Sequence, residues 1–177
     1  MKKLLAVAVL LMGCGGRLLP GDSYTVYIDP AFGDKVSNVI AGLDEWTNTA
    51  HRYGQPLQFD IIVANKQCEI NCGSESFSIH PSTVAQIDTW AHGSDLGFTE
   101  GDPIHQRSNI LVGSDITDPV EWSTCMKHEI GHAIGLHHTG PGTIMFPGWG
   151  NQVSRVVTCA DIQQMAQVRR ELPIVCP

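Results

Sequence analysis

Basic residues are few in this sequence, and they do not cluster. Its 11 Lys and Arg stand against 18 Asp and Glu, which gives a formal net charge of −7. Because proteins neutralise a phosphate backbone with clustered Lys and Arg, we expect no nucleic-acid partner. Long apolar runs, repeats and low-complexity linkers are also missing. A chain of 177 residues of this kind is expected to form one domain with one sizeable core.

The one apolar run at the start of the chain has the features of an export signal. Lys2 and Lys3 precede the run Leu4 to Met12, which is too short to span a bilayer as a stable helix. The segment that ends in Gly13-Cys14 resembles a bacterial lipobox, in which cleavage leaves Cys14 as a lipid-modified N-terminus. A plain signal peptide with an incidental cysteine is the alternative.

This interpretation divides the chain into three parts. We expect a signal peptide over residues 1–13, a lipidated Cys14 with a tether over 14–22, and a single domain over 23–177. The lipid would anchor an exported protein in a membrane. Gly15 is not the aspartate associated with inner-membrane retention, so the outer membrane is the expected location. A secreted or periplasmic protein is the alternative.

Five cysteines besides Cys14 lie in a chain that is expected to mature in an oxidising compartment. Cys68 and Cys72 could close a short loop. One further disulfide is expected among Cys125, Cys159 and Cys176, and the sequence leaves its pairing open. The paired CxxC spacing of a cysteine metal site is missing, which argues against such a site.

The most informative segment is HEIGHAIGLHH at residues 128–138, which fits the pattern H-E-x-x-H-x-x-G-x-x-H at every position. On a helix, His128 and His132 lie on one face and can reach one metal ion. Gly135 can take a positive φ at no Cβ cost, so the helix can end there and the chain can return with His138.

Three neutral histidines predict a catalytic zinc ion with an open fourth position for water. Such an ion lowers the pKa of water to about 7, and a neighbouring carboxylate can take the water proton. We assign this general-base role to Glu129. His137 could in principle compete as the third ligand, but the spacing of the motif favours His138.

With these residues, the sequence resembles the metzincin metallopeptidases. Met145 follows the third histidine by seven residues, where metzincins place a methionine in a tight turn beneath the zinc. The next residues, Pro147, Gly148 and Trp149, look like the matrixin segment that lines a substrate pocket. Matrixins are therefore the most similar branch, although Thr139 stands where they commonly have serine. Their cysteine-switch propeptide has no match.

The fold class expected from periodicity and from this resemblance is α+β. The pattern predicts a strand at 23–28, a helix with Val36, Val39, Ile40, Leu43 and Trp46 on one face, and a strand at 57–64. This order predicts a twisted, mixed and mostly parallel sheet. The expected fold is completed by a further strand at 109–113, a zinc-binding helix capped by Ser123 or Thr124, a Met-turn, and a C-terminal helix over 160–171. Thr158 is the expected cap of that last helix, with Ile162, Met165, Ala166 and Val168 largely inward.

The resemblance also implies how a substrate binds. In the metzincin arrangement, the strand before the zinc helix is the sheet edge that pairs with an extended peptide. Here that strand is formed by Asn109, Ile110, Leu111 and Val112. Edge pairing binds the peptide main chain with little regard for its sequence.

Other histidines give weaker signals. His92, Asp95 and His105 loosely resemble the ligands of a structural zinc site in matrixins, so a second Zn²⁺ is a minor alternative, as is Ca²⁺. His51 and His80 are expected to be ordinary loop or helix-end residues.

The function predicted from the sequence is zinc-dependent endopeptidase activity of a monomer on extended peptides or proteins. A non-catalytic zinc-containing surface lipoprotein that acts as a binding module is the alternative. An amidase or esterase with the same metal centre is a third possibility.

Overall fold

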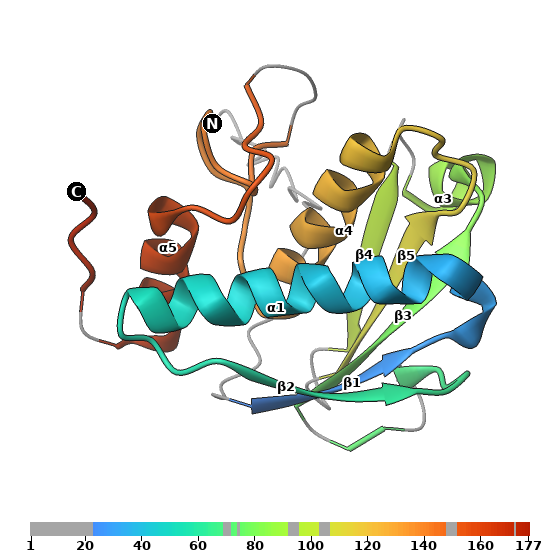
Figure 1. Ribbon diagram of the computed structural model, residues 1–177, viewed down its shortest axis with the longest axis horizontal. Helices are drawn as coiled ribbons and strands as arrows, with labels where there is room; N and C mark the ends of the chain where they lie inside the picture. The colour runs from blue at the N-terminus through green and yellow to red at the C-terminus, as the bar shows by residue number, and fades with distance from the viewer. Residues whose placement is uncertain are drawn as a thin grey trace, which may run out of the picture.

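The computed structural model describes residues 23–68, 72–73, 75–91, 96–102, 107–147, 152–171 and 173–177. The described part is α+β, with a mixed five-stranded sheet and four α-helices (Figure 1). The expected coarse fold class is therefore confirmed. No helix in the described ranges is long and apolar enough to cross a membrane. The expected signal, Cys14 and the tether lie outside the described residues.

The sheet is built mostly from parallel strands. Its order is β2-β1-β3-β5-β4, and only β4 runs antiparallel to its neighbour, β5. The strands span β1 Ser23–Ile28, β2 Gln58–Val63, β3 Ser76–Ser82, β4 Gly97–Asp102 and β5 Arg107–Gly113. The predicted βαβ beginning is confirmed, because β1 and β2 are parallel neighbours joined through a helix.

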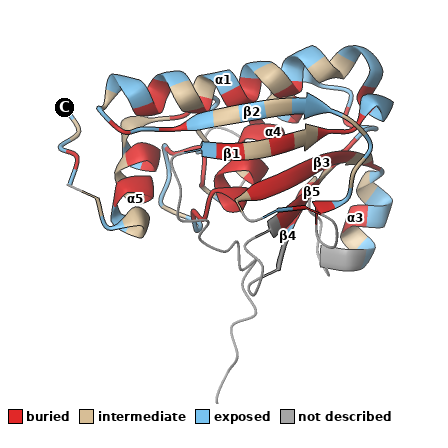
Figure 2. Cartoon of the chain, turned by 90° about the horizontal axis from the view of Figure 1, so that it is seen from below, coloured by how far each residue is buried: buried red, intermediate tan, exposed pale blue. Residues whose placement is uncertain are grey.

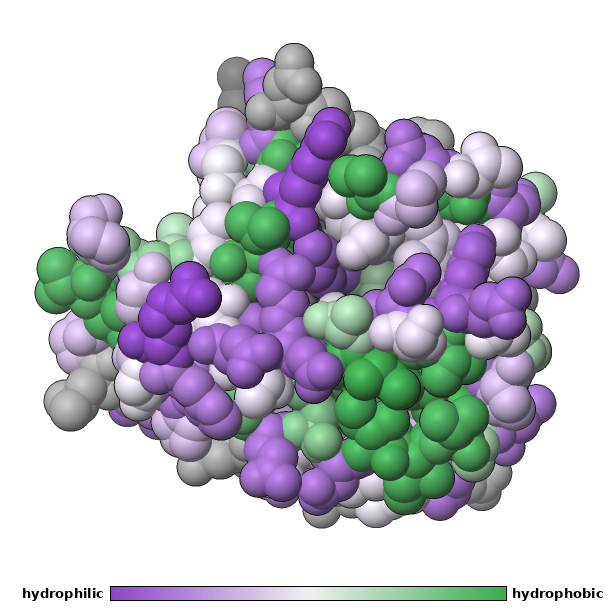
Figure 3. Space-filling model, viewed as in Figure 1, coloured by the Kyte–Doolittle hydropathy of each residue, from purple (hydrophilic) through white to green (hydrophobic). Residues whose placement is uncertain are grey.

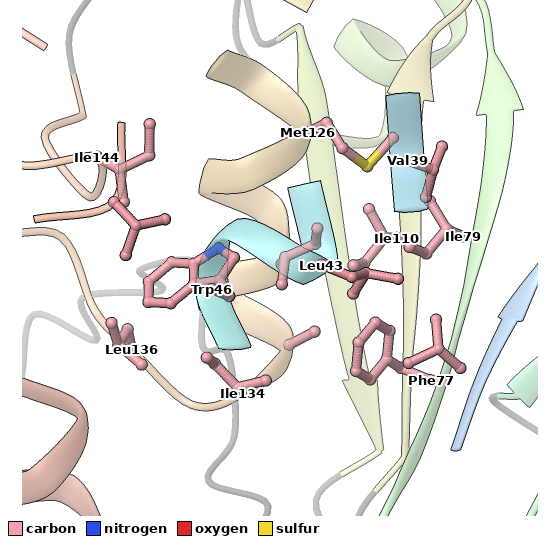
Figure 4. Close-up of a cluster of buried hydrophobic side chains, with 14 of the residues drawn as sticks. Val39, Leu43, Trp46, Phe77, Ile79, Ile110, Met126, Ile134, Leu136 and Ile144 are labelled. Carbon is pink, nitrogen blue, oxygen red and sulfur yellow. The ribbon is translucent and has the colours of Figure 1, made fainter. Parts of the chain in front are cut away.

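That connecting helix, α1 (Val36–Arg52), follows a short 3₁₀ helix, η1 (Pro30–Lys35). The predicted apolar face of α1 is confirmed, since Val39, Leu43 and Trp46 are fully buried. They pack with Phe77 and Ile79 of the sheet and with Met126 of helix α4 (Pro119–Ala133) in a single core (Figure 4). One face of the sheet is thus covered by α1 and α4.

The predicted edge strand at Asn109 to Val112 is wrong. These residues belong to β5, which lies between β3 and β4, so the edge on this side of the sheet is β4. The sequence of β4, GFTEGD, is rich in glycine and acidic residues, which are uncommon in strands. Its pairing with the buried strand β5 makes it a strand, and local pattern does not predict such pairing.

At the opposite edge, β2 is more exposed than the strands inside the sheet (Figure 2). Ile62 and Val63 are 43% and 51% exposed. The largest apolar area on the face seen in Figure 3 lies below α1, where β1 and β2 lie in Figure 1. The predicted strand at 57–64 is confirmed with slightly shorter bounds.

Helix α4, which carries the first two histidines of the HEIGHAIGLHH motif, spans Pro119–Ala133 and begins earlier than predicted. Its N-cap is Asp118, whose carboxylate accepts hydrogen bonds from the N–H groups of Val120 and Glu121. Pro119 at the first helical position fits this start. Ser123 and Thr124, the expected caps, lie inside the helix, because the Asp118-Pro119 pair upstream of them is the stronger start signal.

The C-terminal helix α5 spans Cys159–Arg169, close to the prediction. Thr158 is confirmed as its cap, in a reciprocal capping box with Asp161. Ile162, Met165 and Ala166 are buried as expected, whereas Val168 is half-buried. The described residues form two disulfides: Cys68–Cys72 closes the predicted short loop, and Cys159–Cys176 ties the C-terminal tail to α5. Cys125 is buried and belongs to neither disulfide.

Candidate metal centre

Helix α4 and the turn after it bring three predicted ligands together. His128 and His132 lie one turn apart on α4, and Gly135 has the predicted positive φ, 97°. The chain then returns so that His138 faces both rings. The Nε2 atoms are 3.1 Å apart between His132 and His128, 3.1 Å between His132 and His138, and 3.2 Å between His128 and His138.

Backbone carbonyls fix the rotation and the tautomer of the two helical histidines. His128 Nδ1 donates to the carbonyl of Ile144 at 2.8 Å, and His132 Nδ1 donates to the carbonyl of Leu136 at 2.8 Å. Because Nδ1 carries the proton, Nε2 keeps its lone pair in each ring. Lone pairs that point at one another at this distance repel, and a cation between them removes the repulsion.

The spacing of these nitrogens fits a tetrahedral metal ion. Zinc–nitrogen distances of about 2.0–2.1 Å and tetrahedral angles place two imidazole nitrogens roughly 3.3 Å apart. The observed Nε2 separations of 3.1–3.2 Å are close to this value. Within the described residues, His128, His132 and His138 are the one group of three potential metal ligands.

Burial prepares the two helical histidines to bind a cation at neutral pH. Loss of hydration lowers the pKa of His128, although the neighbouring Glu129 carboxylate partly opposes that effect. Loss of hydration also lowers the pKa of His132, to about 4. Neutral imidazole is the form that binds metals, so neither ring has to lose a proton first near pH 7.

Glu129, the predicted general base, follows His128 in α4, is only 6% exposed, and its carboxylate acts to raise the pKa of His128. Thr99 of β4 donates to Glu129 Oε2 at 2.7 Å and also lies 3.1 Å from the Glu129 carbonyl oxygen. A Cβ atom at Gly97 would lie 2.6 Å from Glu129 Cγ, so only glycine leaves room for this side chain.

Thr99 and Gly97 were not found by the sequence analysis. They are separated by 30 or more residues from Glu129, and β4 has no alternating pattern that would have placed them beside α4. Gly97 was the one local signal for a close contact in this segment, and a glycine alone does not indicate such a contact because glycines are common in loops.

The segment after His138 packs beneath α4. Met145 is fully buried, and a Cβ atom at Gly131 would overlap the Met145 sulfur. The N–H groups of Ile144 and Met145 donate to the carboxylate of Asp161 at 3.2 and 3.3 Å. Asp161 therefore holds the peptide whose carbonyl orients His128. Sequence reasoning found Met145 but missed Asp161 and Gly131.

Of the remaining predicted site residues, some are exposed and others lie outside the described residues. The side chain of His137 is exposed and lies outside the group of potential ligands, as the motif spacing predicted. Pro147 is exposed. Gly148, Trp149, His92, Asp95 and His105 lie outside the described residues.

Of the two histidines expected to be ordinary, His51 is exposed at the end of α1. The expectation for His80 is wrong, because this residue is buried within β3, where its Nδ1 lies 2.9 Å from Asp29 Oδ2. Proline at position 81 made a strand hard to predict there.

Comparisons with known proteins do not place the chain in a family. No protein-family model matches it, and no curated protein matches it.

Proposed function

We propose that this protein is a zinc-dependent endopeptidase of the metzincin kind, closest to matrixins, that cleaves extended peptides. The observation that supports the proposal best is the convergence of three histidine Nε2 atoms next to the buried carboxylate of Glu129. A purely structural zinc site usually has a fourth protein ligand and needs no base. Within the described residues, this centre has three potential ligands.

The ligands His128, His132 and His138 would hold Zn²⁺. When bound, the ion would supply a Lewis acid that polarises a carbonyl and makes water more acidic. Glu129 would take the proton of the attacking water and pass it to the leaving amine as the peptide bond breaks. Thr99 would hold the carboxylate in the orientation required for both transfers.

The edge strand β4 supports a peptide as the substrate. Thr99 of β4 contacts Glu129, so the free edge of the sheet runs next to the proposed base. The outer edge of a strand can pair with an extended peptide through main-chain hydrogen bonds. The substrate strand of this proposal is therefore β4 and not the predicted segment 109–112.

Export is also part of the proposal. The two disulfides support maturation in an oxidising compartment, because disulfides are rare in the cytosol. A lipid on Cys14 would then hold the domain at a membrane surface.

The proposal is tested by exposing a diverse peptide library to the zinc-loaded protein and to Glu129→Ala, with cleavage products identified by mass spectrometry. We expect the variant to keep its zinc and its fold and to lose several orders of magnitude in turnover, as acid–base and metal catalysis together would require. Glu121→Ala is the matched control, since Glu121 is exposed in the first turn of the same helix.

Three results would count against the proposal or one of its parts. Cleavage by Glu129→Ala at nearly the rate of the unmodified protein would remove the general-base assignment. An unmodified protein that is folded and zinc-loaded, yet cuts no peptide, would favour the binding-module alternative. Hydrolysis of small amides or esters alone would favour an amidase or esterase.

A further inference from the structure

A second polar site lies on the sheet face away from α1 and α4. Side chains alternate between the two faces of a strand. In β3, Phe77 and Ile79 are fully buried in the core with α1 and α4, so His80 points to the other face. His80 is nevertheless only 8% exposed there.

His80 is held in place by a buried carboxylate. Its Nδ1 lies 2.9 Å from Asp29 Oδ2, and the other oxygen of Asp29 accepts the N–H of Ala31 at 2.8 Å. This carboxylate also caps η1, so it cannot rotate without loss of a backbone hydrogen bond. The imidazole is therefore fixed in one orientation.

The other ring nitrogen of His80 is unsatisfied. Nε2 is buried and has no hydrogen-bond partner among the residues that the structure describes. When Nδ1 of the neutral ring donates its proton to Asp29, Nε2 is left as an acceptor. A buried acceptor without a partner destabilises the folded state, and most such groups in folded proteins are satisfied. A donor from outside the chain would satisfy it.

His80 and Asp29 line a cavity of about 810 Å³. The cavity lies between β3, β5 and β4, with α3 (Val84–Ala91) and the segment after β2 as its sides. This volume falls within the range of about 300–1,000 Å³ that is typical of small-molecule sites, and it is far larger than a bare ion requires.

The lining defines the charge of a suitable ligand. Asp29 and Glu100 contribute carboxylates, and the described lining residues include no lysine or arginine. Such a lining repels anions and attracts cations. Phe98 adds an aromatic ring, which can contact a positive group, and Gln86 adds an amide.

We propose that this cavity binds a small organic cation whose ammonium or guanidinium N–H donates to His80 Nε2. The site is separate from the metal centre. Thr99 reaches Glu129 on one face of β4, whereas its neighbours Phe98 and Glu100 line the cavity on the opposite face. The proposal does not depend on peptidase activity.

The test uses the full chain loaded with one equivalent of zinc and labelled with ¹⁵N at histidine. Agmatine, glucose, inorganic phosphate and additional zinc chloride are titrated separately, while ring ¹H–¹⁵N spectra follow His80. We expect agmatine alone to shift His80 Nε2, with a dissociation constant of about 1 mM or lower. This measurement is made on the unmodified protein, so its result does not depend on whether a variant folds.

Three variants locate the binding. His80→Phe removes the acceptor and is expected to weaken agmatine binding about tenfold or more. His51→Phe makes the same change at an exposed histidine and is expected to bind as the unmodified protein does. Glu129→Ala is also expected to bind unchanged, which separates this site from the metal centre.

Several outcomes overturn the proposal. Equal binding of glucose would show that the site selects neutral donors, and binding of phosphate would contradict the charge argument. A shift of His80 Nε2 with additional zinc alone would make it a metal ligand. No shift with any probe at about 10 mM, roughly ten times the expected dissociation constant, would show that no ligand site exists.

Discussion

At the residue scale, the smallest feature with a large expected effect is the hydroxyl of Thr99. It donates to Glu129 at 2.7 Å from a strand that local pattern did not predict. A hydrogen bond to a charged group contributes about 1.5–3 kcal/mol, so its loss should be measurable in turnover. Thr99 is a positioning residue, because it would act through Glu129.

We therefore expect Thr99→Val to lower kcat by roughly 10- to 100-fold, which is that free energy expressed as a rate. KM and zinc content should change little, because the substitution keeps the shape of the side chain and touches no metal ligand. Thr99→Ser keeps the hydroxyl and should restore most of the rate. A loss in both variants would show that packing, and not the hydrogen bond, matters at this position.

A second prediction at this scale concerns the choice between two adjacent histidines. His138 contributes one of the three converging nitrogens, whereas the side chain of His137 is exposed outside the group. We expect His138→Ala to lose zinc affinity by several orders of magnitude and His137→Ala to lose little. The measurement is zinc content and competition with a chelator. Equal zinc content in the two purified variants would overturn the choice of ligand.

At the element scale, the packing of α4 depends on a glycine between its histidines, because a larger side chain would not fit there. Gly131 lies between the ligands, and Met145 occupies the space where its Cβ would lie. The turn that carries Met145 is held by Asp161, which also caps α5. The positions of α4, the Met145 turn and α5 relative to one another thus depend on the close contact of Met145 with Gly131 and on the buried carboxylate of Asp161.

Two glycines within helices give a matched test of this packing. Gly131→Ala is expected to destabilise the zinc-depleted protein by about 1–3 kcal/mol, because the new methyl group would have to displace Met145. Gly42→Ala in α1 would meet its nearest atom at 3.4 Å. We expect it to be neutral or to stabilise by roughly 0.5–1 kcal/mol, since alanine is the better helix former. Urea unfolding measures both, and equal effects would contradict the packing argument.

At the scale of the whole molecule, the sheet separates two sites of different chemistry. The histidine centre and Glu129 lie on the face covered by α4, and the cavity with Asp29 and His80 lies on the other. Loss of hydration favours the neutral form of His132, which is buried, and of His128, which is half-buried, and this links the stability of the whole domain to pH.

In zinc-depleted protein, burial lowers the pKa of His132 from 6.5 to about 4 and also lowers that of His128. Between these values the unfolded chain binds more protons than the folded one. The free energy of unfolding should therefore decrease as the pH falls from 6.5 towards 4. His132 alone accounts for on the order of 3 kcal/mol across this window.

Urea unfolding at a series of pH values measures this effect. His132→Gln cannot titrate, so its unfolding free energy should decrease less steeply over the same range. Zinc should raise the stability of the unmodified protein near pH 7 and lose this effect in acid, because protons compete for the same nitrogens. If the unfolding free energy decreased equally steeply with falling pH in both proteins, protonation of His132 would not be the cause of the pH dependence.

The sequence by itself determined the features that depend on spacing along the chain. Ligands four residues apart share a helix face, a glycine allows a positive φ at 135, and a threonine at 158 caps α5. The periodicity of α1 likewise predicted its buried face. These are local relations, and they hold wherever the segment lies in the fold.

The tertiary structure decided what depends on residues far apart in the chain. β4 and not β5 forms the edge of the sheet, and Thr99 on β4 donates a hydrogen bond to Glu129. Met145 packs into the space next to Gly131, and Cys159 forms a disulfide with Cys176. The tertiary structure also paired His80 with Asp29 at a separation of 51 residues. The physical reason is that strand order and close packing are set by the burial of the whole core, whereas a local sequence window specifies only the periodicity and the caps of one element.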